Sequence, residues 1–183
     1  MIGGSNGCIG APMLLFKNPN RNYPIRMVPD NIEGVSYRTS PKGWTDRITF
    51  PEFFGENRTF QPDPQGRHKY IFLDNFSGHK MTPELRDVLK QVNSSIIFFP
   101  PNATHLIQPA DSFIISNLKE NWRKIWDQNK MQMVLEEKFS ASGKIENPGK
   151  RYFLELARDV VKNFNEKQKK DFYKGNENLW IEY

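Results

Sequence analysis

Short apolar runs alternate along the chain with segments whose apolar residues recur at helical spacing. The short runs end in turn-forming or acidic residues, which is typical of buried strands. The longer segments place apolar side chains three or four positions apart, which is typical of amphipathic helices. We therefore expect strands at residues 11–17, 70–74 and 95–99, and helices at residues 82–92, 111–126 and 152–164.

The alternation of strand and helix predicts a parallel α/β core. Residues 44–54 predict a further short or irregular helix, which Pro51 is expected to interrupt. Residues 138–150 are rich in Ser, Gly and Lys and predict a linker. We accordingly divide the chain into a domain of residues 1–137 and a linker with a C-terminal helix over residues 138–183.

Two carboxylates follow the later strands. Asp74 stands at the tip of one predicted strand, and Asp111 comes after the next strand and a Pro-rich turn. Residues at the carboxyl ends of neighbouring parallel strands meet at one sheet edge, where two oxygen ligands can share Mg²⁺. A turn role for Asp74 is the alternative. A helix N-terminal role for Asp111 is compatible with metal binding, so the sequence does not separate the two.

Three motifs in this order carry a family resemblance. They read Asp-Asn-Phe-Ser-Gly-His-Lys at residues 74–80, Pro-Pro-Asn-Ala-Thr at 100–104 and Ile-Gln-Pro-Ala-Asp at 107–111. This pattern, together with the stretch 34–44, resembles the pogo/jerky-like DDE transposases over roughly residues 3 to 125. The resemblance implies an RNase H-like core, a mixed sheet flanked by helices, and cutting and rejoining of DNA by three carboxylates and two ions of Mg²⁺ or Mn²⁺.

The resemblance also assigns roles to single residues. Asp74 would bridge both metal ions and Asp111 would hold one of them. Asn75, His79 and Gln108 would lie in the shell behind these ligands, where they orient the carboxylates. Ordinary turn hydrogen bonding is the alternative for the same three residues.

One carboxylate of the family's triad has no counterpart. In the family the first metal-binding Asp ends the first strand of the sheet, whereas this chain begins at Met1, one strand too late. We expect a remnant that lacks this central strand, binds nucleic acid, and cleaves DNA weakly or not at all. Two alternatives stay open: a nuclease completed by Asp30, Asp46 or Glu52, and a non-catalytic interaction module.

Charge points to DNA as the partner. The formal net charge is +5 and the pI is near 9.3, which suits a polyanion. Lys80, Lys119, Arg123 and Lys124 are the candidate phosphate contacts, although a solvated helix face explains the last three equally well. We expect weak, largely non-specific DNA binding, and self-association through an exposed sheet edge.

The remaining features of the sequence exclude other classes of protein and of metal site. Cys8 is the only cysteine, so there is no disulfide framework and no thiolate metal site. His68 and His105 lack the spacing of a zinc site. No run is long enough to span a membrane and no secretory signal is evident. We expect a nuclear or cytoplasmic protein that is not secreted.

Overall fold

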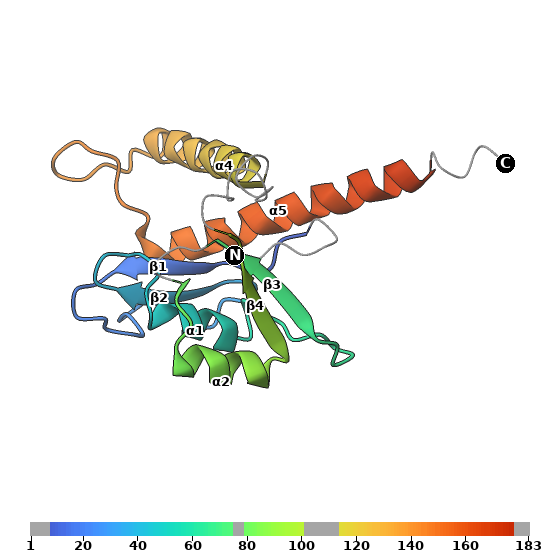
Figure 1. Ribbon diagram of the computed structural model, residues 1–183. Coiled ribbons are helices and arrows are strands. Elements are labelled where there is room, and N and C mark those ends of the chain that lie inside the picture. The colour runs from blue at the N-terminus through green and yellow to red at the C-terminus, as the bar shows by residue number, and fades with distance from the viewer. Residues whose placement is uncertain (1–7, 75–78, 101–113, 178–183) are drawn as a thin grey trace.

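The structure is a computed structural model that describes residues 8–74, 79–100 and 114–177, with side chains described as far as residue 169. Short strands and helices alternate through these ranges (Figure 1). In chain order the elements are β1 (Met13–Lys17), β2 (Ser36–Ser40), α1 (Thr49–Gly55), β3 (Lys69–Leu73), α2 (Pro83–Gln91), β4 (Ser94–Phe98), α4 (Ile115–Leu135) and α5 (Gly149–Glu177). In this part of the chain, no helix has the length and apolarity that crossing a membrane requires.

The segment β3–α2–β4 forms as the sequence predicts. The two strands run parallel, with Lys69 opposite Ser94 and Leu73 opposite Phe98. Thr82 caps α2, because its side chain accepts a hydrogen bond from the backbone N–H of Leu85. Pro83 occupies the first turn, where its missing N–H costs nothing.

The strand β2 was not predicted. Its sequence is Ser-Tyr-Arg-Thr-Ser, which has neither an apolar run nor an apolar alternation. It nevertheless pairs with β1 in parallel, and Tyr37 is almost fully buried. The small hydroxyl side chains of Ser36 and Ser40 are buried as well. Pairing and burial of a polar strand depend on distant neighbours, so the local pattern gave no signal.

The helices also differ from the predicted bounds. The structure extends α4 to Leu135 and α5 from Gly149 to Glu177, beyond the expected ends at residues 126 and 164. Pro51 does not interrupt α1, because it lies in the first turn of the helix. Figure 1 shows α5 as a long helix whose C-terminal half projects beyond the rest of the molecule.

The described strands form two separate parallel pairs, β1–β2 and β3–β4, and not the single mixed sheet that the resemblance implies. Within the described ranges β1 and β3 each have a strand partner along one edge only. Met13 of β1 still packs against the apolar cluster that contains Ile71 of β3. The two pairs therefore share side-chain packing without sharing backbone hydrogen bonds.

Helices cover the two strand pairs unequally. Leu154 and Ala157 of α5 pack against Tyr37 on one face of β1–β2. The helices α1 and α2 pack against Ile71 on the opposite side of the molecule (Figure 1). The alternate residues of β3–β4 point away from this second cluster, and Tyr70, Phe72 and Ile97 are 64%, 58% and 40% exposed. One face of β3–β4 is thus an apolar surface.

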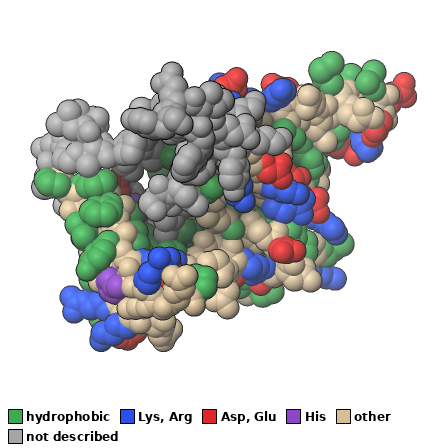
Figure 2. All heavy atoms as spheres, turned by 90° about the vertical axis from the view of Figure 1, so that its right-hand side faces the viewer, with side chains coloured by type: hydrophobic (Ala, Val, Ile, Leu, Met, Phe, Trp, Pro, Cys, Tyr) green, Lys and Arg blue, Asp and Glu red, His purple; other side chains and the backbone are tan. Residues whose placement is uncertain are grey.

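Figure 2 views the molecule from the side on which β3 lies in Figure 1. Apolar side chains gather along the left-hand border of this view, and cations and carboxylates mix towards its right. Phe72 and Phe99 stack with their ring centroids 6.1 Å apart, so the apolar surface continues past the end of β4. This part of the strand pair therefore leaves aromatic and aliphatic side chains exposed.

Candidate functional site

Asp74 lies directly after β3, at the carboxyl end of the strand pair. The pairing continues to this point, because the N–H of Phe99 donates to the carbonyl of Leu73 over 2.8 Å. The side chain of Asp74 is about one third exposed. The structure therefore brings Asp74 to the sheet edge that the sequence predicts, in a half-buried position that a ligand can reach.

His79 contacts Asp74 directly. Its Nδ1 lies 2.8 Å from Oδ1 of Asp74. An ionised carboxylate can only accept a hydrogen bond, so the imidazole donates from Nδ1. The ring also stacks on Phe50 of α1, with centroids 4.6 Å apart and planes inclined by 26°. The hydrogen bond orients the Asp74 carboxylate, and the stacking on Phe50 in the first turn of α1 holds the imidazole in place.

The other predicted site residues lie outside the described residues. These are Asn75, Gln108 and Asp111. The expected approach of the Asp74 and Asp111 carboxylates therefore remains a prediction, and so do the orienting roles of Asn75 and Gln108.

Each of the three alternative carboxylates is held by an arginine. Asp46 forms an ion pair with Arg21 over 2.6 Å and accepts hydrogen bonds from the backbone at the start of α1. Burial acts to raise the pKa of Asp46, but Arg21 and these backbone donors outweigh it and lower the pKa. Asp30 pairs with Arg58 over 3.2 Å. These two aspartates already have strong partners.

Glu52 belongs to a larger ionic network. It pairs with Arg38 over 3.6 Å, and the same guanidinium donates to Glu56 over 2.9 Å. Arg58 in turn donates to Glu56, again over 2.9 Å. Burial raises the pKa of Glu52, whereas the hydrogen bond from Arg58 lowers the pKa of Glu56 to about 2. Glu56 thus joins two arginines that are twenty residues apart, a role that no local sequence pattern indicated.

The ion pairs of Asp30, Asp46 and Glu52 leave these carboxylates less available to a metal ion. Mg²⁺ prefers six oxygen ligands and usually takes several from carboxylates. No cluster of three or more His, Cys, Asp or Glu residues suited to a metal ion occurs within residues 8–74, 79–100 and 114–177. Asp74 is the one predicted metal ligand in these ranges. The described residues alone therefore do not make a magnesium site, and any such site needs ligands from elsewhere.

The candidate phosphate contacts are exposed. Lys80 directly follows His79, whose ring contacts the Asp74 carboxylate. Lys119, Arg123 and Lys124 project from α4, and none of them forms an ion pair with another described residue. Lys119 and Arg123 lie one helical turn apart and line an otherwise apolar cleft of about 560 Å³ between β1, α4 and α5.

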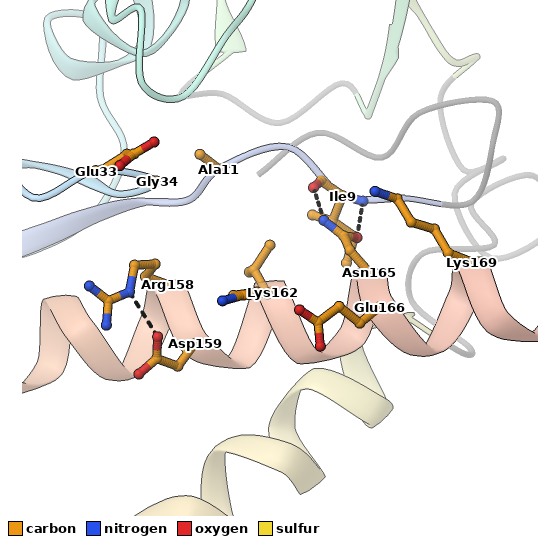
Figure 3. A pocket seen from close by; sticks show the side chains of 11 residues that line it. Ile9, Ala11, Glu33, Gly34, Arg158, Asp159, Lys162, Asn165, Glu166 and Lys169 are labelled. Carbon is orange, nitrogen blue, oxygen red and sulfur yellow. Dashed lines mark hydrogen bonds and ion pairs between the residues drawn. The ribbon is translucent and has the colours of Figure 1, made fainter.

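A second cleft, of about 660 Å³, lies between α5 and the segment before β1, and it contains none of the predicted site residues (Figure 3). Arg158 turns towards Asp159, and Lys162 and Glu166 continue the alternation of charge along the helix. The amide of Asn165 makes two hydrogen bonds of 2.7 Å with the backbone of Ile9. We interpret this cleft as the place where α5 is fastened to the N-terminal segment.

The comparisons with known proteins identify the class of this domain. A family model described as DDE superfamily endonuclease matches residues 11–171. Since the match covers most of the chain, the chain belongs to this family and is a nuclease-like domain of the transposase type. Endonucleases of this family act on DNA and use divalent metal ions. No curated protein and no solved structure matched the chain.

The network around Glu56 predicts a pH dependence of stability. Because the pKa of Glu56 in the folded protein lies below its ordinary value of 4.5, ionised Glu56 stabilises the fold above that pH. This stabilisation is lost as the pH falls from about 4.5 towards 2. Urea unfolding at a series of pH values should show a smaller acid-induced loss of stability in Glu56→Gln. Glu137→Gln, a change at an exposed glutamate, should behave as the unmodified protein does, and equal slopes for all three proteins would refute the role of Glu56.

Proposed function

We propose that these 183 residues are part of the catalytic core of a pogo/jerky-like transposase, which binds DNA through its phosphates and cleaves it weakly or not at all by itself. One observation supports this most directly. Asp74 is held by His79 at the carboxyl end of β3 in a DDE-family chain, while the described residues gather no three-carboxylate cluster. Asp111 is the proposed second ligand of Mg²⁺ or Mn²⁺.

The number of carboxylates that the proposed site can gather limits the chemistry. In-line attack on phosphorus by two ions needs carboxylates that hold both ions in fixed geometry. Asp30, Asp46 and Glu52 would each have to leave an arginine to take part. Moving Asp46 would separate Arg21 from its carboxylate partner, which is costly for a partly buried pair. Moving Asp30 or Glu52 would break an ion pair, although Arg58 and Arg38 would each keep Glu56. A nuclease completed by one of these three residues is therefore the less favoured alternative.

DNA binding follows from the charge of the chain. The excess of cations attracts a polyanion, and Lys119, Arg123 and Lys124 on α4 are exposed without carboxylate partners among the described residues. Such contacts read phosphates and not bases, so the proposed binding is largely non-specific. A nuclear location is the corresponding proposal for the compartment.

The salt dependence of binding tests this proposal. Affinity for a short duplex should fall steeply between 50 and 200 mM salt, since each phosphate contact releases a counterion. The double variant Lys119→Ala/Arg123→Ala should weaken binding and reduce the slope of log K against log salt by about 2. The control is Lys138→Ala/Arg151→Ala, which removes the same charge from cations that Glu136 and Glu155 hold. Salt-independent binding, or none at low salt, would argue against DNA as the partner.

A plasmid-nicking assay tests the proposed catalytic defect. With Mg²⁺ or Mn²⁺ the 183-residue chain should leave supercoiled plasmid almost intact, because one or two carboxylates cannot position two ions. Asp74→Ala and the exposed-site control Asp87→Ala should give the same background. Robust nicking that survives in Asp87→Ala but disappears in Asp74→Ala would mean that the site is complete. Asp30→Asn, Asp46→Asn and Glu52→Gln would then identify the missing ligand.

An interaction module is the second candidate function, because β3–β4 carries an exposed apolar face and β3 has a strand partner along one edge only among the described residues. We propose that this face and edge mediate self-association. Tyr70→Thr/Phe72→Thr introduces β-branched residues, which also favour a strand, and removes the apolar surface. Sedimentation should show fewer oligomers for this variant and no change for Leu135→Gln, which removes an exposed apolar side chain from α4. A monomeric parent protein at all concentrations would refute the proposal.

A further inference from the structure

Trp44 is the most exposed of the described tryptophans. Its residue surface is 71% accessible, whereas Trp122 and Trp126 are partly buried where α4 meets Phe153 of α5. An indole has a large apolar surface, and proteins commonly place one in solvent where it meets a partner. Trp44 makes no contribution to the apolar clusters of the fold. Its indole is therefore available to a ligand.

The turn that carries Trp44 is tightly anchored. The hydroxyl of Ser40 donates to the carbonyl of Trp44 over 2.8 Å, and the N–H of Gly43 donates to the carbonyl of Ser40 over 3.2 Å. Gly43 has φ +73°, which favours glycine, and a Cβ there would lie 3.4 Å from the backbone nitrogen of Lys17. A fixed backbone presents the indole, so little of that backbone's freedom is lost when a ligand binds.

A chain of contacts connects this turn with Asp74. Asp46, two residues after Trp44, accepts hydrogen bonds from the backbone N–H groups of Ile48 and Thr49 at the start of α1. The next residue of α1 is Phe50, whose ring stacks on His79, and His79 contacts Asp74. The Trp44 turn is therefore connected with Asp74 through the start of α1.

The charges around Trp44 favour an anionic partner. Lys42 and Arg47 flank it in the sequence and are exposed. The nearest carboxylate in the sequence, Asp46, is already paired with Arg21 over 2.6 Å. An exposed aromatic ring with cations two positions before it and three positions after it in the sequence matches single-stranded nucleic acid, in which bases offer their faces and phosphates alternate with them.

We propose that Trp44 stacks on an unpaired nucleobase of DNA, while Lys42 and Arg47 contact the flanking phosphates. This inference rests on the proposed DNA-binding function and specifies the state of the strand at the Trp44 turn. A base within an intact duplex has both faces covered by its neighbours, so only a single-stranded or extruded base can occupy this position.

The test compares two probes that differ only in their bases. One is a 12-nucleotide oligothymidylate, and the other is an abasic deoxyribose-phosphate strand of equal length. Trp44→Ala should weaken oligothymidylate binding about tenfold, within the roughly 5- to 150-fold range expected for one stacked base. Binding of the abasic strand should not change, and Trp44→Phe should retain most of the affinity that Trp44→Ala loses. Fluorescence anisotropy of labelled strands measures these differences.

Two controls separate stacking from other causes. Trp44→Leu keeps an apolar surface without an aromatic face, so it should behave like Trp44→Ala if stacking is responsible. Met27→Ala removes another exposed apolar side chain, at 93% exposure, and should change nothing. Thermal unfolding of each variant checks that the fold is intact.

The outcomes distinguish this inference from the proposed function. If both strands bind equally well and Trp44→Ala changes neither, stacking is refuted while DNA binding stands, and Trp44 then belongs to a protein contact. If Trp44→Leu binds oligothymidylate as well as the unmodified protein does, a general apolar contact replaces stacking. If neither strand binds at low salt, the DNA-binding function and the stacking proposal both fail.

Discussion

Parallel pairing of the strands is the constraint on which the remaining structure depends. Parallel neighbours need a crossover connection, which α2 provides between β3 and β4 and the irregular segment 18–35 provides between β1 and β2. The carboxyl ends of paired strands then open on the same side, where loops carry the polar chemistry. Asp74 and the Trp44 turn each follow one of these strand pairs. Phe50 of α1, the helix that follows the Trp44 turn, stacks on His79, which contacts Asp74.

Local sequence could predict the elements whose burial is local. The run before Asp74, the capped helix α2 and the run 95–99 were confirmed within one residue at each end. In these elements the spacing of the apolar residues, the helix cap and the apolar strand runs all indicate the structure that is observed. The position of Asp74 at the strand end followed from the same pattern. The division of the chain at residues 137 and 138 remains a prediction.

Other features depend on contacts between distant residues. Ser36–Ser40 forms a strand because Tyr37 is buried by α5, more than a hundred positions later in the sequence. The ion pairs of Asp30, Asp46 and Glu52 likewise join residues that no short pattern relates. Sequence alone offered these carboxylates as spare metal ligands. The structure shows them engaged with arginines that lie at least fourteen positions away in the sequence.

The pair of hydrogen bonds between Asn165 and Ile9 has a consequence for synthesis of the chain. It joins residues 156 positions apart, near opposite ends of the described chain. Contacts of such separation form only after the intervening chain exists, and closing so long a loop costs entropy. During translation the strand pairs and α2 can assemble earlier, whereas α5 must leave the ribosome before it can cover β1–β2. The apolar side chains of β1–β2 that α5 covers therefore stay exposed until α5 has been made.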